Sequence, residues 1–390
     1  MLKDLSLSAV IAGFVSVLVG FTSSVALIFQ ATQNLHATPE QAASWIWAIG
    51  IGMGVPTILF SLLTRKPILI AWSTPGVVVI AAAAAVKTGT PLTMAQAIGC
   101  FLFSGALIAI AGFSGGFEKI MKKLPMALAS ALLAGVLARF ALDAFGAIPG
   151  NPPLVLSMIA AYVLGRRFWP RVNVPVILLL GVAIVAAQKK FHLESVPWTL
   201  TSPVWMAPEF SAGALVGVGI PLFIVTMASQ NLPGIAAIRV AGYEAPVSPI
   251  VGWTGVATFL LAPFGAFGIN LAAITAAIVL GPEAHPDPAR RYWAPVFSGV
   301  FYLLIGLFGA TVAALFAAFP PELVKAIGGL ALLATIANAL AAALEKEHCR
   351  EASVMTFFVT LSGVTLLGIG SAFWGIVAGG VVLALAKRKG

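Results

Sequence analysis

Charged side chains are scarce throughout this chain of 390 residues. Asp, Glu, Lys and Arg together make up 9% of the sequence, whereas a soluble domain carries about 25%. Hydrophobic residues make up 60%, and the mean hydropathy is +1.03. No stretch holds enough polar residues for a separate soluble domain. The composition therefore excludes an ordinary globular protein.

Residues that support redox, metal or acid–base chemistry are also few. The chain has two cysteines, one inside an apolar run and one in a charged loop, and four histidines in loops or at the ends of apolar runs. This pattern predicts neither a disulfide framework nor a metal site. The buried catalytic cluster that an enzyme needs is not visible. We therefore expect no metal, no cofactor and no enzymatic activity.

Apolar runs of about 20 residues, the length that crosses a bilayer core, recur from one end to the other. Short breaks that contain Pro, Gly or charge separate these runs. The pattern predicts an all-α polytopic membrane protein with fourteen transmembrane segments. The predicted segments are 7–31, 42–63, 67–86, 94–112, 124–145, 152–168, 172–188, 211–237, 247–263, 264–281, 293–318, 321–344, 352–369 and 371–386.

Lysine and arginine cluster in alternate loops. With the N-terminus in the cytoplasm, 17 of the 22 Lys and Arg residues fall on the cytoplasmic side, as the positive-inside rule requires. These are Lys3, Arg65, Lys66, Lys119, Lys122, Lys123, Arg166, Arg167, Arg171, Arg239, Arg290, Arg291, Lys346, Arg350, Lys387, Arg388 and Lys389. The net charge of +9 is therefore a topology signal rather than a nucleic-acid surface, and both termini are expected in the cytoplasm.

Two of the segments are broken at corresponding places in the two halves of the chain. Fourteen segments divide into seven plus seven, which gives the halves opposite orientations, as in secondary transporters. The third segment is interrupted at 72–76, where Pro75 removes a backbone donor and disfavours helix before it. The tenth segment has a Gly-punctuated stretch at 264–270. Each predicts a short strand followed by a half-helix, and such a pair indicates a transporter's substrate site.

The start of a half-helix is suited to binding an anion. Its first N–H groups are unpaired and carry a partial positive charge, so two such ends meeting at the midplane need no buried cation. Ser73, Thr74 and Asn270 lie where they could donate further hydrogen bonds. The alternative is that these side chains only cap the helix starts.

The eighth segment carries three consecutive polar residues, Ser229, Gln230 and Asn231, shortly before Pro233. Amides are costly in a bilayer and usually face the interior of the bundle. We expect a local distortion of the helix and a role in the substrate site, with interhelical hydrogen bonding as the alternative. Ser23 occupies the corresponding part of the first segment, where close helix packing is the alternative.

Arg139 and Asp143 lie one helical turn apart in the fifth segment, on one face where they can pair. Apart from Glu322 at the start of the segment 321–344, Asp143 is the only carboxylate inside a predicted segment. Ionisable residues at such positions indicate coupling or gating. Both residues are close to the outer end of the segment, so snorkelling to the surface is the alternative.

The chain resembles the benzoate/proton symporter family of bacterial inner membranes over essentially its whole length. The resemblance rests on AWSTPG (71–76), PLFIVTMASQNLPGIAA (221–237), AGYEAPVSP (241–249), AAITAAI (272–278), PEAHPD (282–287) and GIGSAFWGIVAGG (368–380). Such proteins are similar in fold to nucleobase and sulfate permeases, which have seven-plus-seven inverted repeats.

The resemblance implies a core domain, 1–120 with 209–319, and a gate domain, 121–208 with 320–390. The substrate would lie between the third and tenth segments, beside the first and eighth. It implies import of benzoate or a similar aromatic carboxylate with a proton, by alternating access. Trp72 and Phe267 would cover the aromatic ring, and a homodimer is compatible with this class.

One departure from the related nucleobase symporters concerns charge. Those proteins carry glutamates in the eighth and tenth segments, whereas this chain has neutral residues there. A neutral site suits a carboxylate substrate but leaves no midplane proton carrier. The proton could travel on the substrate, or use Asp143, Glu283 or His285. A transporter of another small anion or of a nucleobase remains the alternative function, and a passive channel is disfavoured because a closed midplane site implies alternating access.

Overall fold

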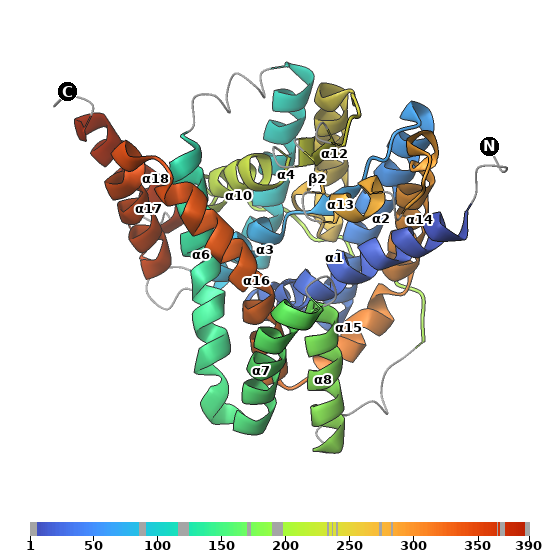
Figure 1. The fold of residues 1–390 in the computed structure, drawn as a ribbon. Coiled ribbons are helices and arrows are strands. Elements are labelled where there is room, and N and C mark those ends of the chain that lie inside the picture. The colour runs from blue at the N-terminus through green and yellow to red at the C-terminus, as the bar shows by residue number, and fades with distance from the viewer. Residues whose placement is uncertain are drawn as a thin grey trace.

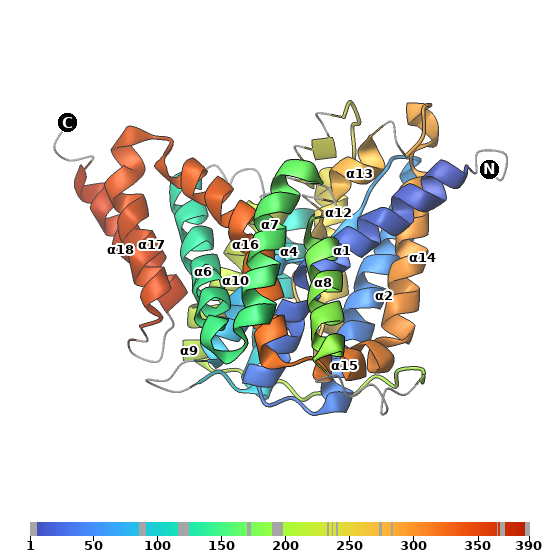
Figure 2. The same cartoon turned by 60° about the horizontal axis from the view of Figure 1, so that its bottom comes forward.

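A bundle of helices encloses one short two-stranded sheet (Figure 1). The computed structural model describes residues 6–85, 91–115, 125–169, 173–188, 198–231, 234–235, 237–238, 241–272, 275–281, 284–364, 366 and 371–386. In most of the bundle the helices stand roughly side by side, with connecting segments at the two ends (Figure 2).

The elements follow the predicted order of segments. The first half contains α1 (Leu7–Asn34), α2 (Pro39–Thr64), β1 (Ile70–Trp72), α3 (Thr74–Ala84), α4 (Met94–Phe113), α6 (Met126–Gly146), α7 (Pro152–Phe168) and α8 (Asn173–Ala187). The second half contains α9 (Ala212–Ala214), α10 (Ile220–Thr226), α12 (Val247–Leu261), β2 (Ile269–Leu271), α13 (Ala276–Leu280), α14 (Trp293–Leu307), α15 (Gly309–Ala317), α16 (Pro321–Leu344), α17 (Arg350–Ser362) and α18 (Ser371–Ala386).

Several helices have the length and composition of membrane spans. Among the described residues, five helical stretches are long and apolar enough: Pro39–Thr64, Met94–Phe113, Met126–Gly150, Val247–Phe264 and Pro321–Leu344. Shorter apolar helices occupy other predicted segments, and large apolar side chains such as Leu63 and Leu179 are exposed on the outside of the bundle. The chain is therefore a mostly helical membrane protein, and the count of fourteen segments stays a prediction.

One group of helices consists of two tightly packed pairs, α2 with α14 and α4 with α12. Glycines let their backbones touch. A Cβ added at Gly50 would lie 2.6 Å from Gly306 Cα, and one added at Gly112 would overlap the backbone of Gly252. Small residues at such crossings let membrane helices approach closely. This group lies toward the upper right of Figure 1.

A second group contains α6, α7, α8, α16, α17 and α18, and lies toward the left and bottom of Figure 1. Within it α6 packs against α16 and α17, α17 against α18, and α7 against α8. A Cβ at Gly329 of α16 would overlap the Phe140 carbonyl of α6. Gly375 and Gly379 of α18 likewise meet threonine side chains of α17.

The contact of α16 with α1, a helix outside these two groups, is looser at Gly328 than the glycine contacts described above. Gly328 of α16 faces α1, and a Cβ there would lie 3.3 Å from Leu27 and 4.0 Å from Gln30. Its neighbour Gly329 is packed against backbone within its own group. At Gly328, α16 therefore meets α1 through side chains and not through backbone.

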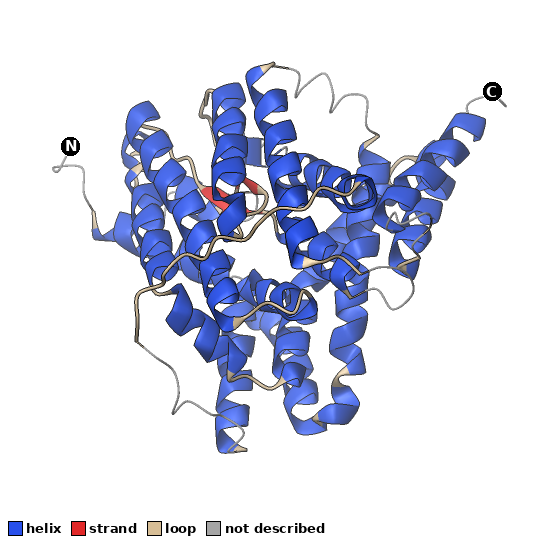
Figure 3. Ribbon diagram, turned by 180° about the vertical axis from the view of Figure 1, so that it is seen from behind, coloured by secondary structure: helices blue, strands red, loops and turns tan. Residues whose placement is uncertain are grey.

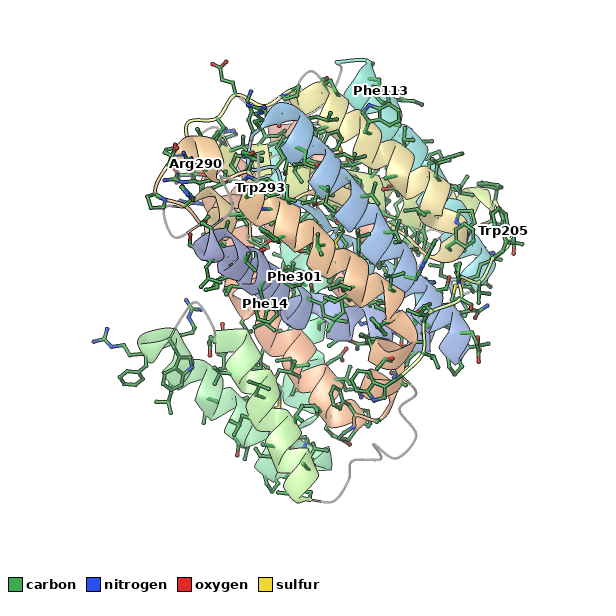
Figure 4. The ribbon with its side chains drawn as sticks, turned by 90° about the vertical axis from the view of Figure 1, so that its right-hand side faces the viewer. Phe14, Phe113, Trp205, Arg290, Trp293 and Phe301 are labelled. Atoms are coloured by element: carbon green, nitrogen blue, oxygen red, sulfur yellow. The ribbon has the colours of Figure 1, made fainter. Side chains whose placement is uncertain are left out.

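The segment 198–211, which we call the strap, runs without helix or strand across one end of the bundle (Figure 3). Its backbone N–H groups donate to the first group of helices and their connections. These bonds join Thr201 to Leu307 O at 2.8 Å, Val204 to Ser44 Oγ at 3.0 Å, Met206 to Pro263 O at 2.8 Å and Glu209 to Ala95 O at 2.9 Å. Trp205 of the strap and Arg290 lie at opposite ends of the bundle (Figure 4).

Candidate functional site

The two strands form an antiparallel ribbon inside the bundle, which confirms the predicted strand-plus-half-helix units. Ile70 pairs with Leu271, Ala71 with Asn270 and Trp72 with Ile269. Paired residues point to the same side of a ribbon, and successive residues alternate. Ala71 and Asn270 therefore share one side, and Trp72 with Ile269 shares the other.

Buried threonines hold the outer edges of the ribbon. Ile70 N–H donates to Thr57 Oγ1 of α2 at 3.0 Å, and Ile269 N–H donates to Thr258 Oγ1 of α12 at 3.0 Å. Both threonines are fully buried. The two bonds occupy equivalent places in the units α2–β1–α3 and α12–β2–α13. They satisfy backbone donors that have no water available at this depth.

Ser73 caps the start of α3. Its buried side chain accepts a hydrogen bond from Gly76 N–H at 3.1 Å, and Thr74 and Pro75 begin the helix. Ser73 therefore caps this helix, and its role in binding a substrate stays a prediction. Its own hydroxyl proton has no acceptor recorded within the described residues. Half-buried Thr74 occupies the first helical position, where its backbone N–H has no partner in the helix.

Gly268 brings β1, β2 and the eighth segment together. Its φ is +50°, and a Cβ there would lie 2.7 Å from Ser73 Cβ and 3.1 Å from Thr226 Oγ1. Only glycine fits this combination of positive φ and close approach. The predicted extended stretch at 264–270 needs correction, because the strand is confined to Ile269–Leu271. Before it come a 3-10 turn, Ala262–Phe264, and Gly265 with φ +102°.

Asn270 is fully buried beside Gly268. Its Nδ2 donates to Gly268 O at 2.6 Å, and its Oδ1 has no hydrogen-bond partner. Asn270 lies within the strand rather than at a helix start, so the capping alternative does not apply to it. An unpaired buried carbonyl oxygen is costly, and at a ligand site it is a group that a ligand can satisfy.

The eighth segment is distorted, as the polar residues before Pro233 predict. A continuous helical stretch from Ala212 to Asn231 contains two π-helical turns, Leu215–Gly219 and Met227–Asn231. Such turns are rare and occur frequently at functional sites. The second turn packs against β2 and α6.

The polar residues of this turn have different surroundings. Asn231 Oδ1 accepts from Leu271 N–H at 2.9 Å and its Nδ2 contacts Met227 Sδ at 3.2 Å, so this amide joins the turn to β2. Interhelical bonding therefore accounts for Asn231. Gln230 is half-buried, and no hydrogen bond of its amide is recorded within the described residues. The side chains of Ser229 and Ser23 lie outside the described part of the chain.

Thr226 is a polar residue of the site that sequence reasoning missed. It is fully buried next to Gly268, and its Oγ1 has no hydrogen-bond partner. Most membrane threonines bond to their own helix, so the residue type gives no signal. The sequence shows only that it lies three residues before the first member of the polar triplet.

The aromatic residues lie in two separate places. Trp72 packs edge-on against Phe21 of α1 with ring centroids 5.6 Å apart, and its buried indole N–H has no partner. Phe267 is buried against Trp45 at 5.6 Å and Phe101 at 5.7 Å. The structure therefore places the two predicted aromatic residues in different clusters, and their contact with a ligand stays a prediction.

Arg139 and Asp143 are not brought together. Asp143 is exposed, and the Arg139 guanidinium lies against Gly363 at the end of α17. Within the described residues the two form no ion pair. The structure thus places both away from the ribbon, and their predicted role in coupling or gating stays a prediction.

Side chains of the loops around 243 and 291 hold the C-terminal end of α13 and the connection that follows it. Arg291 donates to Leu280 O and to His285 O, both at 2.8 Å, and Tyr243 OH donates to Pro288 O at 2.8 Å. Burial raises the pKa of the Tyr243 hydroxyl. His285 Nδ1 accepts from Asp287 N–H at 3.0 Å, and Glu283 lies outside the described residues.

The ribbon and the helices that follow its strands contain no charged or titratable side chain. None is present in 67–85, 212–238 or 262–281. In the described part of the chain, no three His, Cys, Asp or Glu residues gather as a metal site would require. The site is therefore an array of neutral groups. They are the start of α3, the hydroxyls of Ser73 and Thr226, and the amides of Asn270 and Gln230.

Comparison with known proteins gives a consistent set of relatives. A family described as "Benzoate membrane transport protein" matches residues 3–385. Inner membrane protein YdcO of Escherichia coli (strain K12) is 45% identical, over 95% of this chain and 94% of that protein. The benzoate membrane transport protein of Acinetobacter baylyi (strain ATCC 33305 / BD413 / ADP1) is 36% identical, over 97% and 94%.

A solved structure shares the fold. The transmembrane domain of the cyanobacterial bicarbonate transporter BicA superimposes with a TM-score of 0.57 at 13% sequence identity, over 97% of each chain.

Proposed function

Because this chain belongs to the benzoate membrane transport protein family, we propose that it carries benzoate or a similar small aromatic carboxylate across the bacterial inner membrane. The family consists of membrane transport proteins, and the chain is a transporter rather than an enzyme. The observation that carries the substrate proposal is the neutral, buried polar array around Gly268, with Thr226 Oγ1 and Asn270 Oδ1 unpaired.

The substrate's carboxyl group is proposed to lie at the start of α3. There the Thr74 N–H, which has no partner in the helix, the Ser73 hydroxyl and the Thr226 hydroxyl can donate hydrogen bonds. Asn270 lies beside Gly268, which adjoins Ser73, and the Gln230 amide makes no hydrogen bond to a described residue. Trp72 and Phe21 offer apolar surface to an aromatic ring. The stretches 212–238 and 262–281 contain no charged side chain, so the substrate would meet only neutral groups there.

We propose that transport works by alternating access between two domains. The core domain would be 1–120 with 209–319, and the gate domain 121–208 with 320–390, in a seven-plus-seven inverted repeat. The equivalent bonds of Thr57 and Thr258, and the two glycine-mediated helix pairs, support this division. Both termini in the cytoplasm, and a homodimer, stay predictions.

Uptake of radiolabelled benzoate into proteoliposomes tests the substrate. We expect protein-dependent uptake that saturates and that an inward proton gradient increases. Protein-free vesicles are the control, because undissociated aromatic acids also cross lipid unaided. Absence of saturable uptake would contradict the substrate proposal, and uptake unaffected by the gradient would contradict proton coupling. Competition by salicylate but not by uracil, sulfate or bicarbonate would separate an aromatic acid from the alternative substrates.

A further inference from the structure

We propose that the site binds its aromatic acid in the undissociated form, so that the transported proton is carried on the substrate's own carboxyl group. This inference rests on the proposed function and specifies the ionisation state of the substrate. It is carried by the hydrogen-bonding capacity that the site leaves open at Asn270 and Thr226.

The orientation of the Asn270 amide is fixed by its neighbour. Gly268 O lies 2.6 Å from Nδ2, so this atom must be the donor. The reversed amide would place two carbonyl oxygens at this distance, where they repel. Oδ1 is therefore the atom left without a partner, and it can only accept a hydrogen bond.

A buried acceptor requires a donor from the ligand. A carboxylate has only acceptor oxygens and would place lone pairs against Asn270 Oδ1. A carboxylic acid has one O–H, which can donate to Oδ1, and one C=O, which can accept from the Thr226 hydroxyl. Both protein groups adjoin Gly268, Thr226 Oγ1 at its Cβ position and the Asn270 amide at its carbonyl, and the inference requires one carboxyl group to bridge them.

No protein group at the site can hold the proton instead. The ribbon, α3 and the eighth segment contain no titratable residue. The helices packed against them contribute Glu40 at the exposed start of α2, Cys100 in α4, and Arg139 with Asp143 in α6. Cys100 bonds to Ala214 O, and Asp143 is exposed. None of these groups contacts Asn270 or Thr226 in the described structure.

Calorimetric binding to the purified full chain tests the inference with three ligands of similar shape. Benzoic acid and benzamide each have a donor and a C=O, whereas acetophenone has only the C=O. We expect the apparent affinity for benzoate to fall about tenfold per pH unit between about pH 6 and pH 8, following the undissociated fraction. One proton should be taken up per benzoate bound. Benzamide should bind independently of pH without proton uptake, and acetophenone at least about tenfold more weakly.

Variants test whether the proton taken up on benzoate binding resides on the ligand or on a protein side chain. Asp143→Asn and His285→Gln should leave proton uptake on benzoate binding unchanged. Thr226→Val, which keeps the shape, should weaken benzoate and benzamide alike by about tenfold without changing the pH slope, and Thr226→Ser should restore binding.

Two results would overturn this inference while leaving the proposed function intact. One is a benzoate affinity that does not change with pH and involves no proton uptake, which means that the anion binds. The other is proton uptake that accompanies benzamide binding or disappears in Asp143→Asn, which means that a protein group is the carrier. If none of the three ligands binds at any pH, the proposed function fails, and the inference fails with it.

Discussion

At the scale of single residues, the site depends on one position that has no functional group. Gly268 has a positive φ and touches both Ser73 and Thr226. Its carbonyl also orients the Asn270 amide. A side chain at this position would separate the groups that the substrate is proposed to contact, without removing any of them.

We therefore expect Gly268→Ala to abolish benzoate binding and to lower stability. The left-handed backbone costs alanine about 1–2 kcal/mol, and overlap with Ser73 Cβ adds about 1–3 kcal/mol. Gly115→Ala is the matched control, because Gly115 has φ +62° but open space around its Cβ position. Thermal unfolding in detergent and ligand binding measure both effects. Equal destabilisation by the two variants would show that the contact with Ser73 is unimportant.

At the scale of elements, each strand of the ribbon depends on a threonine from the helix before it. The hydroxyl is the only recorded acceptor for the first N–H of the strand. Because the ribbon has only two strands, the N–H groups on its outer edges have no neighbouring strand to which they can donate hydrogen bonds.

Thr258→Val should destabilise the protein by about 1–3 kcal/mol, because the Ile269 N–H loses its partner while buried. Thr254→Val in the same helix is the control. Thr254 donates to Val251 O of its own helix, so its removal leaves no buried donor unpaired. Thermal unfolding compares the two, and hydrogen exchange at Ile269 should accelerate in Thr258→Val only. Similar behaviour of both variants would contradict the proposed anchoring.

Local signals in the sequence predicted the elements of the site but not their contacts. Pro75 and the glycines at 265 and 268 interrupt helix where they stand, so both strand-plus-helix units could be predicted. The Thr258 to Ile269 bond and the Thr226 approach to Gly268 link residues distant along the chain and leave no local pattern. Asn231 looked available to a ligand, yet it holds Leu271. The predicted anion preference likewise did not account for the orientation of the Asn270 amide.

At the scale of the whole molecule, the proposed mechanism requires α16 to move along α1. The contact at Gly328 permits this, since no backbone interlocks there, whereas Gly329 joins α16 firmly to α6. Motion should therefore take place on the Gly328 side of α16.

A cross-link across this contact should stop transport. We expect oxidation of a Leu27→Cys, Gly328→Cys double variant to reduce benzoate uptake at least about tenfold, with recovery on reduction, since sliding is then prevented. The control is Asn151→Cys with Gln188→Cys, which replaces an amide pair within the second group of helices. The native cysteines are buried and should not interfere. Full uptake by the oxidised Leu27–Gly328 pair would contradict movement at this surface.

The strap has a consequence for the direction of that movement. It is fastened to one group of helices at one end of the bundle, and its Trp198, Trp205 and Phe210 side chains are 85%, 63% and 62% exposed. Aromatic rings at the end of a membrane bundle favour the headgroup layer. Lifting the attached helices along the bilayer normal would pull these rings out of that layer, whereas tilting them would not. The strap would therefore favour tilting of the attached helices over their translation along the bilayer normal.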